Sequence, residues 1–258
     1  MQKTVLAIAA HPDDIEFVMS GTLMRLKAAG WRLHYHNIAN GCGGSLTLPA
    51  DEIAAVRLGE AQAAAAALGA TFHPPFCDDL AVFYTPDLMR KLAAVVRQTK
   101  PSIILTHAPI DYMEDHQNAA RLAVFGAFSR GVPNYETEPP RDAFSDPVAV
   151  YHAQPHGNRT PMREIVKPTL TVDVTDLLKQ KRDLLALHAS QASWLGDTQA
   201  MSYLQTMEDL GREVGLMSGR FEIAEGWRQH LHLGLAPEDF DPLSNALAPH
   251  AHFLTPAS

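Results

Sequence analysis

Short apolar runs alternate along the chain with longer segments of helical periodicity. Strands are predicted at residues 4–8, 33–39, 71–72, 102–106 and 170–174. Helices are predicted at residues 21–30, 52–68 and 86–98, after residue 116, and from residue 175 or 176 to 188. Strands that alternate with helices are typical of a parallel sheet with helical crossovers. We therefore predict an α/β, Rossmann-like fold with a mostly parallel sheet and helices on both of its faces.

The pattern weakens in two regions, although the length of 258 residues still fits one domain. Residues 131–147 are rich in Pro, Glu and Asp and break the periodicity, so we expect an irregular active-site loop region over 131–160. Residues 218–258 give no clear element and are expected to form a carboxy-terminal extension. The single predicted domain is 1–258.

The composition excludes several classes of function. The formal charge of −8 and the lack of a dense Lys/Arg run argue against binding to nucleic acid or an anionic membrane. No apolar run reaches membrane-spanning length, and no secretory signal pattern opens the chain. Cys42 and Cys77 form no disulfide framework. We expect a soluble, cytoplasmic protein with a small-molecule partner; the apolar carboxy-terminal stretch would suit a homo-oligomer contact.

A cluster of metal-binding residue types follows the first predicted strand. Residues 9–16 read Ala-Ala-His-Pro-Asp-Asp-Ile-Glu. His11 and Asp14 are close enough to hold one divalent cation, while Asp13 can direct a free carboxylate at a metal-bound water. Taken alone, such a cluster is as readily a turn or a helix N-cap.

A second cluster, Asp-Tyr-Met-Glu-Asp-His at 111–116, follows the strand predicted at 102–106. The carboxyl ends of parallel strands meet at one edge of a sheet, so the two clusters are expected to meet there. His116 then completes a set of two histidines and one carboxylate, which is typical of an open catalytic zinc site. We expect one Zn²⁺ per chain, with Fe²⁺ or another divalent ion left open because ligand type discriminates weakly between them.

On these residues the chain resembles the PIG-L/LmbE-like zinc-dependent N-acetylglucosaminyl deacetylases. The most specific motifs are Ala-His-Pro-Asp-Asp at 10–14 and the 111–116 cluster; weaker support comes from residues 40–41, 57–60, 68–69, 172–175 and 188–191. The resemblance implies that His11, Asp14 and His116 bind zinc. It also implies that Asp13 is the general base, and the chemistry lets the same carboxyl protonate the leaving amine.

Met113 departs from the family, which commonly has His-Pro-Asp-His where this chain has Met-Glu-Asp-His. The missing histidine is thought to polarise the substrate carbonyl, and a thioether cannot donate a strong hydrogen bond. Tyr112, His107 and His156 are candidates to replace it. We hypothesise that His156 does so, because its segment follows a strand-like run at 147–150. The alternative is an ordinary surface-loop histidine.

Two further residues are assigned to substrate binding. Arg57, on the predicted helix 52–68, can grip a sugar hydroxyl or an acidic group through its fork of donors. The equally plausible alternative is a solvated arginine paired with Glu60. Tyr112, in the second cluster, is also assigned to substrate binding. The glycine loop at 40–45 fits neither nucleotide-binding template. The resemblance implies that it lies beside the zinc.

The leading interpretation is a zinc-dependent amidohydrolase that acts on a linear amide C–N bond. Its substrate would be an N-acylated small molecule such as an N-acetylglucosamine derivative, with acetyl as the expected acyl group. One alternative is a hydrolase with Cys42 as nucleophile, since this cysteine lies in a glycine loop. The other is a metal-binding, non-catalytic protein, suggested by Met113.

Overall fold

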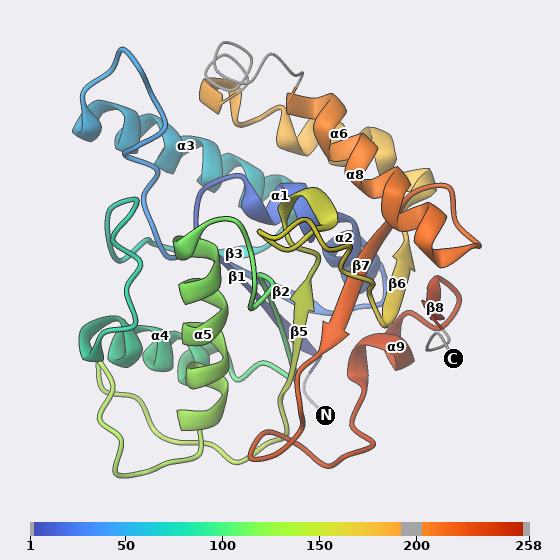
Figure 1. Cartoon of the computed structure of the whole chain (residues 1–258). Helices are drawn as coiled ribbons and strands as arrows, with labels where there is room; N and C mark the ends of the chain where they lie inside the picture. Colours follow the sequence, from blue (N-terminus) through green and yellow to red (C-terminus); the bar gives the residue numbers. More distant parts are fainter. Residues whose placement is uncertain (1–2, 192–202, 255–258) are drawn as a thin grey trace.

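A computed structural model describes residues 3–191 and 203–254 of the chain (Figure 1). In these residues, strands form one sheet in the order β3-β2-β1-β4-β5-β7-β6-β8. The strands are β1 (Thr4–Ala9), β2 (Arg32–Asn37), β3 (Thr71–His73), β4 (Ile103–Thr106), β5 (Ala149–Ala153), β6 (Leu170–Asp173), β7 (Ala224–Gln229) and β8 (Ala251–Phe253). The α-helices are α1 (Asp14–Val18), α2 (Ser20–Ala28), α3 (Ala50–Leu68), α4 (Pro86–Thr99), α5 (Glu114–Ser129), α6 (Leu178–Leu185), α8 (Tyr203–Ser218) and α9 (Pro242–Ala246).

The sheet has a parallel half and an antiparallel half. Strands β3, β2, β1, β4 and β5 pair in parallel, whereas β7 pairs antiparallel with β5 and β6, and β8 pairs antiparallel with β6. The predicted α/β fold with a mostly parallel sheet is therefore confirmed. The antiparallel half was not predicted, because buried polar residues such as Glu225 interrupt the apolar pattern of β7.

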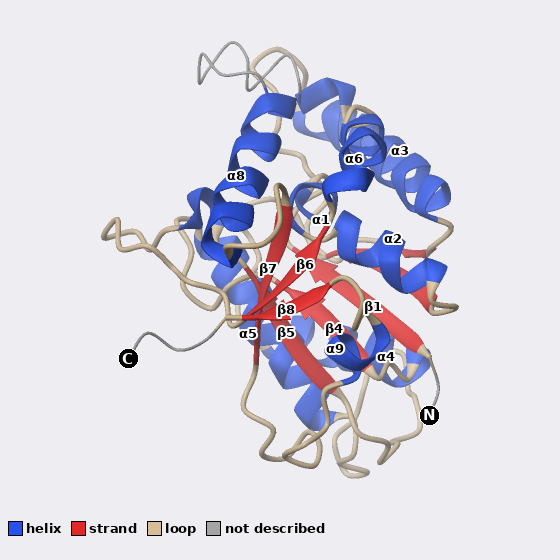
Figure 2. Cartoon of the chain, turned by 90° about the vertical axis from the view of Figure 1, so that its right-hand side faces the viewer, coloured by secondary structure: helices blue, strands red, loops and turns tan. Residues whose placement is uncertain are grey.

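Alternate side chains of the central strands enter two separate cores. Val5 and Ala7 of β1 pack in one cluster with residues of α2, α3, α6 and α9. Leu6 and Ile8, which point the other way, pack with residues of α4 and α5. The two groups of helices lie on opposite sides of the sheet (Figure 1, Figure 2). The predicted placement of helices on both faces of the sheet is therefore confirmed. A strand that is buried on both faces appears in the sequence as a continuous apolar run.

Two segments differ from the expected description. The region 131–160, expected to be irregular, contains β5, whose residues are all buried. The stretch 218–258, expected to form an extension, contributes β7 and β8 to the sheet. In the described part of the chain, no helix is both long and apolar enough to cross a membrane.

The sheet topology places the site. β1 lies between β2 and β4, and the chain continues from β1 to β2 on one side and reaches β4 on the other. Such a switch point leaves a crevice at the carboxyl ends of the strands, where α/β proteins bind their ligands. The segments that follow β1 and β4 carry the two predicted metal-binding clusters.

Candidate metal centre and active-site cavity

His11, Asp14 and His116 come together at the switch point. His11 follows β1, Asp14 opens α1, and His116 lies in the first turn of α5. The potential ligand atoms of the three residues all lie within 4.8 Å of one another. His11 Nδ1 and His116 Nε2 each lie 3.4 Å from an oxygen of the Asp14 carboxylate. The group predicted from the sequence is thus assembled and is able to hold a metal ion.

The outer nitrogen of each histidine faces a second carboxylate. His11 Nε2 lies 3.0 Å from Asp115 Oδ2, and His116 Nδ1 lies 3.1 Å from Asp111 Oδ1. Both aspartates are almost fully buried. Carboxylates in this position orient metal-bound histidines and fix their tautomers. No role of their own was predicted for Asp111 and Asp115, because only the fold shows which imidazole nitrogen each one faces.

The cluster is electrostatically suited to a cation. Burial alone would lower the pKa of His11, but Asp115 and Asp14 raise it to about 10. Burial alone would raise the pKa of Asp14, but His116 and His107 hold it well below its usual range. Three buried or half-buried carboxylates therefore stand around two imidazoles. Nitrogen and oxygen donors in this number fit a divalent metal such as zinc.

Asp13 is held by side chains from two distant helices. The Tyr203 hydroxyl, at the start of α8, donates to Asp13 Oδ2 at 2.8 Å. Arg57 Nη2, from α3, lies 3.5 Å from the same oxygen. Burial and the charge of Asp14 raise the pKa of Asp13, while Arg57 and Tyr203 oppose the shift. Tyr203 was not identified from the sequence, where no motif surrounds it.

Arg57 is buried under the glycine loop. Its guanidinium donates to the carbonyl oxygens of Pro12 and Gly41, the latter at 3.3 Å. A Cβ added at Gly41, whose φ is +82°, would lie 2.6 Å from Arg57 Cδ, so glycine is required there. Glu60 binds Ser190 instead of Arg57. A solvated Arg57–Glu60 pair is therefore wrong, while contact of Arg57 with substrate stays a prediction.

These groups line one cavity of about 500 Å³. Its polar lining is formed by His11, Asp13, Asp14, Gly43, Gly44, Arg57, Asp79, His116, His156, Gln191 and Thr206. Its apolar and aromatic lining is formed by Phe17, Leu80, Tyr112, Met113 and Tyr203. A cavity of this size with a few convergent polar groups is typical of a small-molecule site.

Two of the three candidates to replace the missing histidine line this cavity. The His156 ring lies 5.4 Å from that of Tyr112, and burial lowers its pKa, so the imidazole is neutral near pH 7. Its backbone N–H donates to Asp111 Oδ2 at 3.1 Å, which ties its segment to the metal centre. His107 does not line the cavity. Its ring stacks on His116 at 4.1 Å, and its Nε2 accepts the Ala10 N–H at 3.0 Å.

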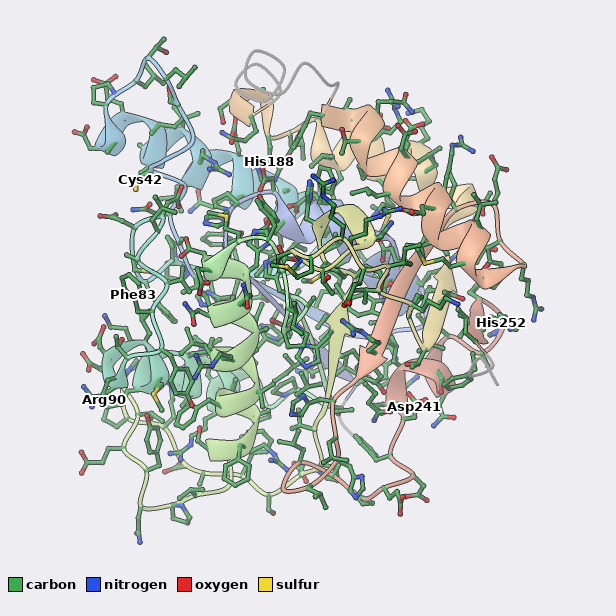
Figure 3. All side chains as sticks on the ribbon, in the orientation of Figure 1. Cys42, Phe83, Arg90, His188, Asp241 and His252 are labelled. Atoms are coloured by element: carbon green, nitrogen blue, oxygen red, sulfur yellow. The ribbon has the colours of Figure 1, made fainter. Side chains whose placement is uncertain are left out.

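Cys42 is poorly suited to act as a nucleophile. It does not line the cavity, and its sulfur lies toward the left edge of the molecule in Figure 3. Burial and the nearby Asp79 and Asp78 raise the pKa of its thiol, which disfavours the thiolate.

His188 lies inside the molecule, with Nε2 3.2 Å from Glu16 Oε2, and both side chains are fully buried. His188 therefore contacts α1 through Glu16 and does not line the cavity.

Comparisons with known proteins agree with this geometry. Residues 6–125 match the family described as GlcNAc-PI de-N-acetylase, PIG-L. The chain is 28% identical over 196 residues to diacetylchitobiose deacetylase of Thermococcus kodakarensis, covering 73% of this chain and 70% of that protein. It is 26% identical over 234 residues to 4-oxalmesaconate hydratase of Pseudomonas putida, covering 87% and 88%.

The solved structures include a similar fold. The N,N'-diacetylchitobiose deacetylase from Pyrococcus horikoshii superposes with a TM-score of 0.75 at 22% identity, covering 93% of this chain and 88% of that one. At this identity the likeness concerns the fold. Residues 6–125, which contain both predicted metal-binding motifs, therefore carry a match to the PIG-L family domain.

Proposed function

We propose that this protein is a zinc-dependent hydrolase that removes an acyl group from the nitrogen of a small N-acylated molecule, such as an N-acetylglucosamine derivative. The observation that carries the proposal is the cavity in which Asp13 stands beside the His11, Asp14 and His116 group. Relatives described as deacetylases of diacetylchitobiose and of an acetamido-deoxyglucopyranoside support the class of substrate.

His11, Asp14 and His116 would hold the metal, and their donor set suits zinc. A bound zinc ion would supply a water of lowered pKa and would polarise the substrate carbonyl. Asp111 and Asp115 keep the two imidazoles oriented through their outer nitrogens.

Asp13 is the proton carrier. Its Oδ2 is engaged by Tyr203 and Arg57, whereas its Oδ1 has no hydrogen-bond partner among residues 3–191 and 203–254. Oδ1 is therefore the atom that takes the proton of the attacking water and later returns it to the leaving amine. The raised pKa of Asp13 helps it to retain the proton between the two steps.

His156 takes the role that Met113 cannot fill. Its neutral ring lines the cavity and can donate one N–H to the carbonyl oxygen as negative charge develops there. The bond from its backbone to Asp111 fixes its segment relative to His116.

The charges of the cavity do not favour an anionic substrate. Asp13, Asp14 and Asp79 line it, and Arg57 is the one arginine or lysine in the described lining. The guanidinium of Arg57 is already engaged by Pro12, Gly41 and Asp13. With the two positive charges of a bound zinc ion added, these side chains carry no net charge, so a polycarboxylate gains no net attraction here over a neutral sugar amide.

A second candidate function is the addition of water to an unsaturated carboxylate. It is favoured by the match to a hydratase over 87% of this chain, against 73% for the diacetylchitobiose deacetylase of Thermococcus kodakarensis. The same cavity would serve, but its charges give an unsaturated carboxylate no net attraction, so this candidate comes second. The two reactions are distinguished by their products, since only deacylation releases an amine.

The test combines metal content with product analysis. We expect about one zinc per chain in the purified protein, loss of zinc in His11→Ala and His116→Ala, and retention in Asp13→Asn and in the control His232→Ala. Zinc-loaded protein should release amine from N-acetylated sugars, and Asp13→Asn should not. Release of no amine, with loss of ultraviolet absorbance from conjugated unsaturated acids, would favour the hydratase candidate. Zinc bound equally by all variants would overturn the proposed site.

The proposal includes a cytoplasmic setting. Cys42 and Cys77 are both free, as thiols are in a reducing compartment.

A further inference from the structure

Four rings form a continuous arc along the cavity. The ring of Tyr112 lies 5.4 Å from that of His156, which lies 5.3 Å from Phe17, which lies 5.6 Å from Tyr203. All four residues line the cavity. Each spacing is within the range in which aromatic rings contact one another. The arc joins residues from the segments before α5, after β5, in α1 and in α8.

The arc begins and ends at the reacting groups. At one end, the Tyr112 ring stands edge-on to His116 with 5.5 Å between the centroids. At the other end, the Tyr203 hydroxyl binds Asp13. A substrate amide placed between the metal ligands and Asp13 therefore has aromatic surface alongside it. Asp79 and Gln191 add polar groups to the lining of the same cavity.

Leu80 adds an exposed apolar side chain to the lining. Its φ of 62° lies in the left-handed region, and 70% of its surface is exposed. Its N–H donates at 2.7 Å to Asp115 Oδ2, the oxygen that also faces His11 Nε2. A bulky residue in this conformation persists only where its surroundings hold it. Here the carboxylate that orients a metal ligand also fixes Leu80 at the cavity.

Met113 makes the lining beside His116 more apolar. It lies next to Tyr112 in the sequence, immediately before α5, and it lines the cavity. A thioether adapts to irregular apolar shapes. Leu80, Tyr112 and Met113 thus offer apolar surface next to the metal centre that an acetyl group is too small to cover.

We propose that the acyl half of the substrate is a bulky apolar group, an alkanoyl chain longer than acetyl or an arylacetyl group, seated along this arc and against Leu80 and Met113. This inference rests on the proposed deacylase function and names its substrate class. The hydroxyl-bearing amine half then lies against Asp79 and Gln191, so the two halves of the substrate match the two kinds of cavity wall.

The test is a matched series of N-acylglucosamines carrying acetyl, butanoyl, hexanoyl and phenylacetyl groups. The zinc-loaded full chain is assayed for kcat/KM by amine release. We expect kcat/KM to rise about fourfold for each added methylene that is buried, the factor that corresponds to ~0.8 kcal/mol. A second series, alkyl glycosides of N-acetylglucosamine from methyl to hexyl, should show no comparable rise.

Variants locate the effect. In Leu80→Ala and Tyr112→Ala, the ratio of kcat/KM for hexanoyl over acetyl should fall about tenfold or more. This ratio cancels any loss common to both substrates. Leu46→Ala is the matched control, because Leu46 is 73% exposed and does not line the cavity. Its ratio should equal that of the unmodified chain.

The outcomes separate the two proposals. If the acetyl compound is hydrolysed as fast as the longer ones, the inference about the acyl group is wrong and the deacylase function stands. A gain confined to the glycoside series would likewise overturn the inference, because the arc would then hold the amine half. Release of amine from no member of either series by zinc-loaded protein would overturn the deacylase function itself.

Discussion

Asp13 combines an unusual backbone with a carboxylate held from two sides. Its φ of 111° directs the side chain into the cavity region while Asp14 begins α1. Tyr203 and Arg57 converge on Oδ2 from α8 and α3. Strain of this kind is typical of functional positions, where the surroundings enforce a conformation that the residue would otherwise avoid.

We expect Tyr203→Phe to lower kcat about 10- to 100-fold, because a hydrogen bond to a charged group contributes ~1.5–3 kcal/mol. KM and zinc content should stay the same, since Tyr203 contacts Asp13 rather than a metal ligand. Asp13→Asn should lower kcat by roughly 10²- to 10⁴-fold. In the Asp13→Asn variant, the additional change Tyr203→Phe should not lower kcat further.

The control for this cycle is Tyr84→Phe, which alters a partly exposed tyrosine outside the cavity. If the effects of Tyr203→Phe and Asp13→Asn were simply additive, Tyr203 would not act through Asp13.

His156→Ala should reduce kcat by roughly 10- to 10³-fold, as expected for the loss of one donor to a developing oxyanion. His156→Gln should recover part of the loss because its amide can still donate. Zinc content of both variants should match the unmodified chain. Unchanged turnover of His156→Ala with every substrate tried would exclude the proposed replacement of the family histidine.

At the scale of elements, the glycine loop and α3 act as one unit. Arg57 projects from α3 beneath Gly41 and Gly44, with its guanidinium against the Pro12 carbonyl. A Cβ at Gly44 would lie 2.6 Å from Arg57 Nη1. The loop therefore carries glycine so that an arginine can reach the segment that holds Asp13.

We expect Gly41→Ala to lower the free energy of unfolding by about 1–2 kcal/mol from the left-handed backbone alone, with a further loss from the clash with Arg57. It should also lower kcat, because a displaced Arg57 frees Asp13. The matched control is Gly59→Ala in α3, where an added Cβ meets no atom within 4 Å. That variant should be more stable by roughly 0.5–1 kcal/mol. Urea unfolding of both variants tests the contrast, and equal stability of the two would contradict it.

Strand β7 was not predicted from the sequence, for a physical reason. In β7, Glu225 is buried and accepts the N–H groups of Gly21 and Thr22 at 2.9 and 2.7 Å. It also pairs with the buried Lys181 of α6. A buried charge satisfied by a distant helix start and a distant lysine breaks the local apolar pattern. By contrast, β1 and β4 are buried on both faces and were read directly from their apolar runs.

At the scale of the whole molecule, burial of neutral histidines makes the fold sensitive to acid. His36 of β2 is fully buried, and its Nε2 has no hydrogen-bond partner in the part of the chain that the structure describes. Burial, with the neighbouring His73, lowers its pKa to about 3. The unfolded chain binds a proton at this residue below about pH 6.5, whereas the folded chain does not. Stability is therefore lost as the pH falls from about 6.5 toward 3.

His36→Phe should lose about 2 kcal/mol less stability than the unmodified chain between pH 6.5 and 5, since each pKa unit corresponds to ~1.4 kcal/mol. Phenylalanine retains the ring contact with Phe76, whose centroid lies 4.5 Å away. Urea unfolding at both pH values measures the free energy of unfolding of the two proteins. A chelator present throughout removes any contribution from metal binding. Parallel losses in the two proteins would show that His36 does not carry this sensitivity.

The sequence by itself determined the α/β class, the parallel strands β1 to β4, and the meeting of His11, Asp14 and His116 in a group that could hold a metal ion. These features depend on local periodicity and on motifs that directly follow strands, where the edge of a parallel sheet brings them together. The tertiary structure alone decided which atoms Asp111, Asp115, Arg57 and Tyr203 face. Those contacts join residues up to 190 positions apart, and no local pattern encodes a distance across the fold.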